Sequence, residues 1–356
     1  MRGKKILYAA SSRRHIERFH LDYIRALRNL GNEVRVMANG ADIDIRLEKK
    51  ILSLENLKSL FRLKKILKRE CFDCIILNTA LAAFVVRAAL GRRRGRVVYV
   101  VHGFLFDYPP RNARQRLLWL AEWLLRGRVD RVITMNSADL EIAKRLWPSG
   151  RVRQSRGMGC EVRGVITPAK IIREEIFGRG RFVLCFVGEL SRRKNQRFLI
   201  QATAALRLQI PQILLCLVGD GGEMTELLSE ARSLGVEDSV RLLGERDDAC
   251  DFMRSCDVYV SASLSEGMPF NVIEALGAGA TVLASDVKGH RDIITDGVDG
   301  FLYKSEDLDD FVNKTCQIYH KSIEIDKKYA LEKYMKFSKS EVFETTLRLL
   351  TEEINE

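Results

Sequence analysis

Short runs of almost wholly apolar residues alternate with longer helical stretches along most of the chain. Parallel strands buried on both faces have this composition, and the stretches between them are long enough for crossover helices. The alternation occurs twice, which predicts an α/β protein of two doubly wound, Rossmann-like domains. The expected strands are Ile6–Ala10, Val34–Ala38, Cys74–Leu77, Val97–Val101 and Arg131–Thr134 in the first half, and Phe182–Val187, Ile213–Val218, Val240–Leu243, Val258–Ser261 and Thr281–Ala284 in the second.

Helical periodicity and glycine content predict the rest of the organisation. Helices are expected at Ile16–Leu30, which is followed by Gly31, and at Leu57–Arg69. Regular periodicity is lost between residues 157 and 180, which predicts a linker. We expect one domain over residues 1–160 and another over residues 165–330, facing each other across a cleft where their ligands would meet. A C-terminal helix at about residues 335–356 is expected to pack back on the first domain.

The cysteines and histidines do not indicate a metal or disulfide protein. Cys71 and Cys74, two of eight cysteines, have no second pair at the spacing of a four-ligand zinc site. His15 and His20 are five residues apart and would not share a face of a single helix. The sequence therefore predicts no metal and no cofactor.

The lengths of the apolar runs indicate where the protein is located, and the distribution of charge indicates its partners. No apolar run approaches the roughly 18 residues that span a bilayer, and no signal peptide is visible, so we expect a cytoplasmic protein. The net charge of +12 divides into +17 for residues 1–150 and −5 for the remainder. A basic half predicts a polyanionic partner, either nucleic acid or an anionic membrane, unless it is only a solvated face.

The most informative segment follows a predicted strand of the second half and leads into a helix. Gly267 allows a tight turn, and Pro269 suits a helix start because its missing N–H costs little there. The first-turn N–H groups of Phe270–Asn271 would bind phosphate or sugar hydroxyls. Glu266 lies before the helix and Glu274 about two turns along it, where carboxylates would accept hydrogen bonds from sugar hydroxyls.

Residues 180–305 contain a series of motifs in a fixed order. They are Phe186-Val-Gly188-Glu-Leu-Ser-x-Arg-Lys194-Asn195, Leu217-Val-Gly-Asp-Gly221, Asp257-Val-Tyr-Val-Ser, Glu266-x7-Glu274, Gly277-x-Gly279, Gly289-His290-Arg-Asp292 and Asp296-Gly-Val-Asp-Gly300. This series resembles the retaining family-4 glycosyltransferases of GT-B fold, of the bacterial polysaccharide-assembly type. The resemblance implies a nucleotide-sugar donor bound by the second domain and an acceptor bound by the first.

The resemblance implies a role for each matching residue. Lys194 matches the cation that binds the donor diphosphate and would stabilise the departing phosphate. Glu266 matches the residue that contacts the sugar ring, Glu274 the one that binds the ribose, and His102 an active-site residue that faces the donor sugar. The other donor-binding positions it implies are Gly188, Arg193, Gly244, Gly267, Phe270 and Asn271.

Two features depart from simple expectation. Many family members carry Arg where this chain has Glu189, so one phosphate cation is missing unless Arg192 or Arg193 takes its place. Asp42-Ile-Asp44 spells the metal-binding Asp-x-Asp of glycosyltransferases with the other major fold. It stands in the wrong architecture, and we assign it no metal.

The expected function is transfer of a hexose or N-acetylhexosamine, with retention, from a nucleotide diphosphate donor to a lipid-linked or growing polysaccharide acceptor. The resemblance favours a UDP-sugar. Two alternatives are another enzyme of the same fold, such as a UDP-sugar epimerase, and a basic nucleic-acid-binding protein, although no nucleic-acid-binding motif is present.

The basic half is expected to bind the inner face of the cell membrane peripherally. Arg111, Arg114 and Arg116 precede a helical stretch in which Trp119 and Trp123 would share a face at a headgroup zone. Alternatively, the two indoles face the sheet as core residues. A second helix offers Lys58, Arg62, Lys65 and Arg69 along one side.

Overall fold

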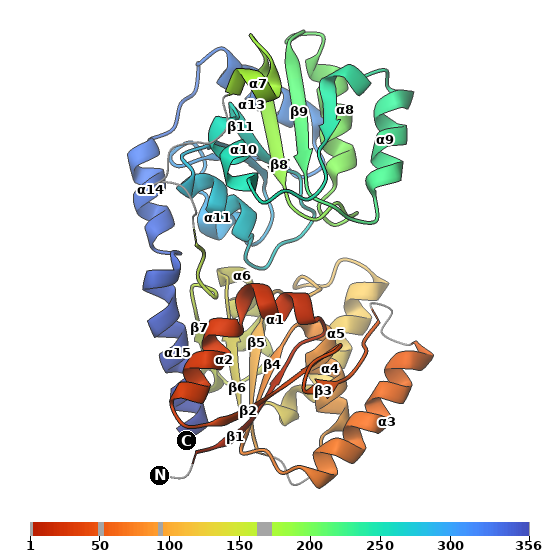
Figure 1. Ribbon diagram of the computed structural model, residues 1–356, viewed down its shortest axis with the longest axis vertical. Helices are drawn as coiled ribbons and strands as arrows, with labels where there is room; N and C mark the ends of the chain where they lie inside the picture. The colour runs from red at the N-terminus through yellow and green to blue at the C-terminus, as the bar shows by residue number, and fades with distance from the viewer. Residues whose placement is uncertain (1–2, 49–52, 92–94, 162–172, 356) are drawn as a thin grey trace. The chain divides into compact units, whose positions relative to one another are not determined.

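The computed structural model describes residues 3–48, 53–91, 95–161 and 173–355 (Figure 1). The chain forms two compact units, of which the first comprises Met1–Gly159 and Lys339–Glu356 and the second Cys160–Ser338. Each unit contains one parallel sheet wound by helices, which confirms the predicted α/β class with two Rossmann-like domains. The second unit continues past residue 330, where the sequence placed its end, and residue 165, its expected start, lies outside the described residues.

The described part of the first unit has a seven-stranded sheet in the order β3-β2-β1-β4-β5-β6-β7, with every neighbouring pair parallel. Strand β1 lies in the interior of this sheet, since Ile6 pairs with Val34 of β2 and with Cys74 of β4. The strands are β1 Lys5–Ala9, β2 Glu33–Ala38, β3 Ile43–Asp44, β4 Cys74–Asn78, β5 Arg96–Val101, β6 Arg131–Thr134 and β7 Val152–Gln154, and the helices are α1 Arg13–Phe19, α2 Leu21–Asn29, α3 Leu54–Arg69, α4 Ala80–Ala89, α5 Ala113–Leu125, α6 Ser137–Leu146 and α15 Lys339–Asn355.

The second unit repeats this winding. Its sheet has the order β10-β9-β8-β11-β12-β13, again with parallel pairs. The strands are β8 Phe182–Val187, β9 Ile213–Val218, β10 Val240–Leu242, β11 Val258–Ser261, β12 Thr281–Ser285 and β13 Phe301–Tyr303, and the helices are α7 Arg173–Phe177, α8 Gln196–Leu206, α9 Met224–Ser233, α10 Ala249–Ser255, α11 Phe270–Gly277, α12 His290–Ile293, α13 Leu308–Tyr319 and α14 Lys327–Met335.

One predicted helix is wrong. The stretch expected to be continuous over Ile16–Leu30 is two helices, α1 and α2, which meet at His20. His20 has φ −125° and ψ −11°, outside the helical region, so the chain changes direction there. The side chains before and after this break therefore do not follow the spacing rules of a single helix.

The C-terminal helix belongs to the first unit, beside α2 (Figure 1). Its Glu353 carboxylate is 2.6 Å from a guanidinium nitrogen of Arg96 and 2.5 Å from one of Arg131, at the start of β5 and of β6. Near the other end of α15, Lys339 pairs with Asp22 of α2 at 2.5 Å. No helix in the described ranges combines the length and apolar composition needed to cross a bilayer.

Asp42 and Asp44 have local roles in the fold. Asp42 Oδ2 accepts a hydrogen bond from the Val36 N–H at 3.0 Å, and Asp44 Oδ1 accepts one from the Gly40 N–H at 2.7 Å. The two carboxylates thus satisfy one backbone donor of β2 and one of the turn between β2 and β3.

Candidate functional site

The candidate site of the second unit lies where the winding of its sheet reverses. Strands β8 and β11 are neighbours, but the chain winds away from them in opposite directions, toward β10 and toward β13. Ligands of doubly wound sheets bind at the carboxyl ends of such strands. The loop after β8 carries Lys194, and the loop after β11 carries Glu266 and leads into α11.

Lys194 and Glu266 form a buried ion pair at this edge. Their side chains approach to 2.7 Å between Lys194 Nζ and Glu266 Oε1, and the residues are 8% and 6% exposed. Lys194 also donates to Asn271 Oδ1 at 3.4 Å, from the first turn of α11. Three residues that the sequence assigned to donor binding thus meet, although they lie up to 77 positions apart.

Arg193 completes this charged group, and Arg192 does not. A guanidinium nitrogen of Arg193 lies 2.8 Å from Glu266 Oε2 and donates to the Ser265 carbonyl at 3.0 Å. The Arg192 side chain is 91% exposed and pairs with Glu223 instead. Of the two candidates for the cation missing at Glu189, Arg193 is therefore the one beside Lys194.

Burial and charge act in opposite directions on the pair. Burial lowers the pKa of Lys194, an effect that Glu266 opposes and Arg193 reinforces. Burial also opposes ionisation of Glu266, but the cations of Lys194 and Arg193 outweigh it and lower the pKa of this carboxyl to about 2. The Glu266 carboxyl is therefore ionised at neutral pH, with Lys194 and Arg193 at its two oxygens.

Beside this group, the ends of β8 and β9 and the start of α11 lie close together. Asn271 Nδ2 donates to the Val187 carbonyl at 3.1 Å and to the Tyr259 hydroxyl at 2.8 Å, which ties α11 to β8 and β11. A Cβ added to Gly219 would lie 1.9 Å from the Gly188 carbonyl oxygen. The carboxyl ends of β8 and β9 can therefore lie together only with glycine at position 219.

Gly244 contacts the loop that follows β9, and Glu274 lies near Tyr259 of β11. The Gly244 carbonyl accepts a hydrogen bond from Gly219 at 2.7 Å, which places the start of the β10 loop next to the ends of β8 and β9. Glu274 is half-buried on α11, close enough to Tyr259 for its charge to help raise the pKa of that phenol.

One detail of the expected phosphate site is wrong. The Phe270 N–H donates to the Met268 carbonyl at 3.1 Å within the turn that contains Gly267, so it is not an open donor at the start of α11. The Asn271 side chain, rather than the Phe270 amide, carries the polar contacts of this turn.

His290 lies near the Lys194–Arg193–Glu266 group. It was not selected as a site residue from the sequence, although it lies in the motif Gly289-His290-Arg-Asp292. It is fully buried, and burial is the main reason why its pKa falls to about 4. Its Nδ1 contacts the Ser285 carbonyl at 2.7 Å, so the neutral ring donates there and its Nε2 faces the Ser261 hydroxyl at 3.3 Å. A Cβ at Gly289 would lie 2.9 Å from the Glu266 carbonyl, so this turn supports the Glu266 loop.

His102 belongs to the first unit, where it follows β5 and lies among other imidazoles. Its ring centroid is 4.8 Å from that of His15 and 5.1 Å from that of His20. His15 and His20 are themselves 3.1 Å apart between their Nε2 atoms. The expectation that these two histidines would point apart is wrong, because the helix breaks at His20. Burial lowers the pKa of His15 to about 4 and those of His20 and His102 well below the usual value, so all three rings are neutral at pH 7.

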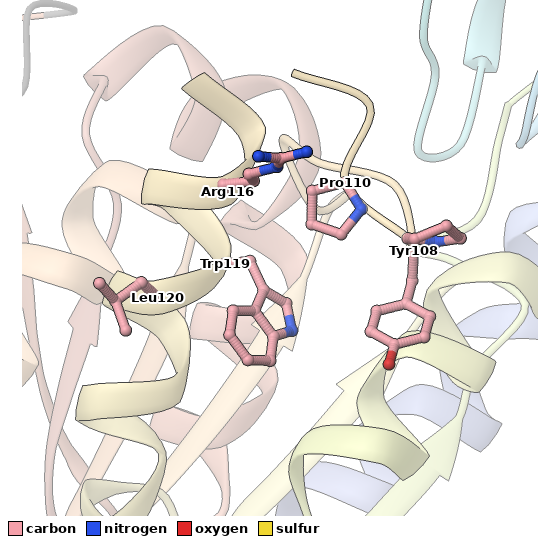
Figure 2. Close-up of a pocket in the computed structure, with 6 residues that line it drawn as sticks. Tyr108, Pro110, Arg116, Trp119 and Leu120 are labelled. Atoms are coloured by element: carbon pink, nitrogen blue, oxygen red, sulfur yellow. The ribbon is translucent and has the colours of Figure 1, made fainter. Parts of the chain in front are cut away.

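A second feature of the first unit is an apolar pocket of about 420 Å³ (Figure 2). Arg116 and Trp119 project from α5 toward the loop that carries Tyr108 and Pro110. The lining is almost wholly apolar, with Arg116 as its one charged member among the described residues. Trp119 packs against the core of the unit, whereas Trp123 is exposed and its ring centroid lies 4.2 Å from the Arg126 guanidinium, so the two indoles differ in their surroundings.

Helix α5 is anchored by a buried ion pair. Arg87 of α4 donates two hydrogen bonds of 2.8 Å to Glu122 of α5, and both side chains are buried. The outward side of α5 exposes the apolar residues Leu117, Leu120, Trp123 and Leu124. Helix α3, on the other side of α4, similarly exposes Leu54, Leu57 and Phe61. We call these two stripes the outer apolar faces of α5 and α3.

Comparison with known proteins decides the family. The profile for glycosyl transferases group 1 matches residues 169–337, and that for glycosyltransferase family 4 matches residues 16–155. EpsD of Bacillus subtilis, named as a glycosyltransferase, is 32% identical over 335 residues, covering 89% of this chain and 88% of EpsD. The chain belongs to the family-4 glycosyltransferases.

Other relatives and solved structures agree with this assignment. The UDP-Gal:α-D-GlcNAc-diphosphoundecaprenol α-1,3-galactosyltransferase of Escherichia coli is 29% identical over 74% of this chain and 71% of its own length. Anabaena HepE, solved with UDP-glucose, has a TM-score of 0.74 at 21% identity, and sucrose-phosphate synthase from Thermosynechococcus elongatus one of 0.76 at 18%. Each of these two similarities covers 98% of this chain, together with 100% of HepE and 98% of the synthase. The fold is therefore GT-B. This family-4 enzyme is a glycosyltransferase.

Proposed function

We propose that this enzyme transfers a sugar from a UDP-sugar to a lipid-linked acceptor, with retention of anomeric configuration, during assembly of a bacterial surface polysaccharide. The observation that carries the proposal is the group formed at the reversal point of the second sheet by the buried pair Lys194–Glu266 and the more exposed Arg193. Two cations there suit a diphosphate, and the carboxylate between them suits sugar hydroxyls. HepE, with the same fold, was solved with UDP-glucose.

The ion pair has a defined part in this proposal. A bound diphosphate competes with Glu266 for Lys194 and Arg193, because its oxygens carry more charge than one carboxylate. Glu266 then becomes available to accept hydrogen bonds from the donor sugar. The two cations remain where negative charge develops on the departing diphosphate, which lowers the barrier without a metal at this position.

Retention needs no covalent enzyme intermediate in this scheme. The bond from the anomeric carbon to the diphosphate oxygen breaks while the acceptor oxygen bonds to the same face of the sugar. The acceptor's proton passes to the departing phosphate oxygen, so charge balances. His102 is proposed to face the donor sugar, Glu274 to bind the ribose, and Gly188, Gly244, Gly267, Phe270 and Asn271 to line the donor site. Exclusion of water would protect the donor from hydrolysis.

The acceptor half of the proposal is supported by a relative and by the first unit. The E. coli relative acts, by name, on a diphosphoundecaprenol-linked sugar. The outer apolar faces of α5 and α3 lie on either side of α4 and are flanked by exposed cations, among them Arg114 and Arg116 on α5 and Lys58 and Arg62 on α3. Apolar side chains next to cations suit an anionic membrane surface, and the pocket beside Arg116 suits the lipid part of an acceptor. We propose peripheral binding at the inner face of the cell membrane.

The test is a transfer assay with the full chain. UDP-glucose, UDP-galactose and UDP-N-acetylglucosamine are each offered with a short-chain polyprenyl-diphosphate-linked sugar, and UDP release is measured together with the mass of the lipid product. We expect one donor to give product that an α-glycosidase removes. Conversion of the donor without an acceptor, or stabilisation of the fold by GDP- or ADP-sugars but not by UDP, would refute the proposal.

A further inference from the structure

Three histidines from separate segments of the first unit converge on one point. His15 lies on α1, His20 at the break between α1 and α2, and His102 directly after β5. One candidate ligand atom from each ring lies within 4.8 Å of the other two. No other group of three such side chains meets this criterion in the described parts of the chain. The convergence depends on the break at His20, since a continuous helix would separate His15 from His20.

The cluster contains an unsatisfied nitrogen. His102 Nε2 is buried, and no residue that the structure describes forms a hydrogen bond with it. The Nε2 atoms of His15 and His20 lie 3.1 Å apart, so in the neutral rings one of them donates its N–H and the other accepts with its lone pair. Buried polar atoms normally have partners, so an unpartnered imidazole nitrogen beside two others indicates a missing ligand.

An outer contact orients one of these rings. The Tyr8 hydroxyl of β1 lies 2.9 Å from His20 Nδ1, which leaves Nε2 directed at His15. Metal-binding histidines commonly use their second nitrogen in such a contact, which fixes the tautomer and the ring orientation. Tyr8 is itself fully buried, so the contact is held by the core of the sheet.

We propose that His15, His20 and His102 bind one divalent transition-metal ion, with Zn²⁺ as the preferred occupant. Neutral imidazoles are ligands of zinc, copper and nickel rather than of magnesium or calcium. Ligands about 2.1 Å from a tetrahedral zinc lie about 3.4 Å from one another, so the ion would draw the most distant nitrogen inward. Three histidines leave a fourth position for water or a substrate hydroxyl. The inference goes beyond the proposed function and shares one residue with it, because the imidazole of His102 would be a ligand of the ion as well as a neighbour of the donor sugar.

The test measures metal binding by the full chain after removal of metals with a chelator. We expect titration calorimetry to show one equivalent of Zn²⁺, and Co²⁺ in its place to give the visible absorption bands of a tetrahedral site. H15Q should weaken Zn²⁺ binding by more than a hundredfold, because it removes a ligand. Y8F should weaken it by about 10–100-fold, because it removes only the outer contact.

Matched controls separate this site from incidental binding. H320Q removes an exposed histidine of the second unit, and C71S removes an exposed thiol, so both should bind Zn²⁺ like the wild type. H15Q alters a partly exposed residue, and circular dichroism will verify its fold. The proposal is wrong if the wild type binds no equivalent of Zn²⁺, if H15Q and Y8F bind as tightly as the wild type, or if C71S or H320Q abolishes binding.

Discussion

Lys194 Nζ lies 2.7 Å from Glu266 Oε1, and this contact joins two loops 72 residues apart in the sequence. The contact is buried, and Arg193 binds the other oxygen of the same carboxylate. The Glu266 carboxylate, paired with both Lys194 and Arg193, holds these two cations in place before a donor binds. In the proposed function, this carboxylate is also the group that the donor diphosphate displaces from the two cations.

Lys194→Ala is expected to lower kcat by about a hundredfold or more, because it removes an electrostatic stabiliser of the departing diphosphate. Arg192→Ala is the matched control, since this neighbouring cation pairs with Glu223 at the surface. Steady-state kinetics with the donor identified by the transfer assay give the comparison. Wild-type turnover in the Lys194 variant would show that the cation does not act on the diphosphate.

Glu266→Gln and Glu274→Gln should affect different kinetic parameters. Glu274 is proposed to contact the ribose, which changes little during reaction, so its variant should mainly raise KM for the donor. Glu266 is proposed to contact the reacting sugar, so its variant should mainly lower kcat. The reverse pattern would mean that the two roles are assigned the wrong way round.

The Lys194–Glu266 pair should also make stability depend on acid pH. The folded pKa of Glu266 is about 2, below the ordinary value of 4.5, so its ionised form stabilises the fold above pH 4.5. That contribution is lost as pH falls from 4.5 through 2. The difference in unfolding free energy between wild type and Glu266→Gln should therefore shrink by up to about 3 kcal/mol over this range. Chemical denaturation followed by circular dichroism measures it, and a constant difference would contradict the assignment.

The buried Arg87–Glu122 pair should be costly to break on one side only. Arg87→Met leaves a buried carboxylate without its partner, for which we expect a loss of about 3–5 kcal/mol. The double variant Arg87→Met/Glu122→Leu should be more stable than the single one, because no buried charge is left unpaired. Tryptophan fluorescence reports this unit alone, since Trp119, Trp123 and Trp147 all lie in it. A loss below about 1 kcal/mol in the single variant would show that the pair does not anchor α5.

Binding to vesicles should depend on the outer apolar face of α5. Leu117 and Leu124 are 61% and 65% exposed, so Leu117→Glu/Leu124→Glu should not disturb the core. We expect this variant to bind anionic vesicles at least about tenfold more weakly in a sedimentation assay. Leu208→Glu/Leu228→Glu, with the same charge change in the second unit, should bind like the wild type. An equal loss of vesicle binding in both variants would mean that the added negative charge alone causes it. Vesicle binding by the wild type should weaken as the salt concentration rises.

Buried strands were predictable from the sequence, whereas of the four short edge strands only β10 was expected. Phe182–Val187, Ile213–Val218 and Val258–Ser261 were expected over the ranges observed, because a strand covered on both faces must be apolar throughout. Strands β3, β7 and β13 went undetected, since each has only two or three residues and lies at or beside an edge of its sheet. Motif order alone was also enough to predict the fold and the family.

Tertiary structure decided which of those residues act together. Local spacing separated His15 from His20, and only the break at His20 brings both to His102. A charged residue such as Glu122 reads as exposed in a helix, and its burial depends on Arg87 from another helix. The choice of Arg193 over Arg192 beside Glu266 is likewise a matter of loop geometry. Sequence periodicity reports which face of an element is buried, whereas the partner of a buried charge comes from a distant segment that periodicity does not encode.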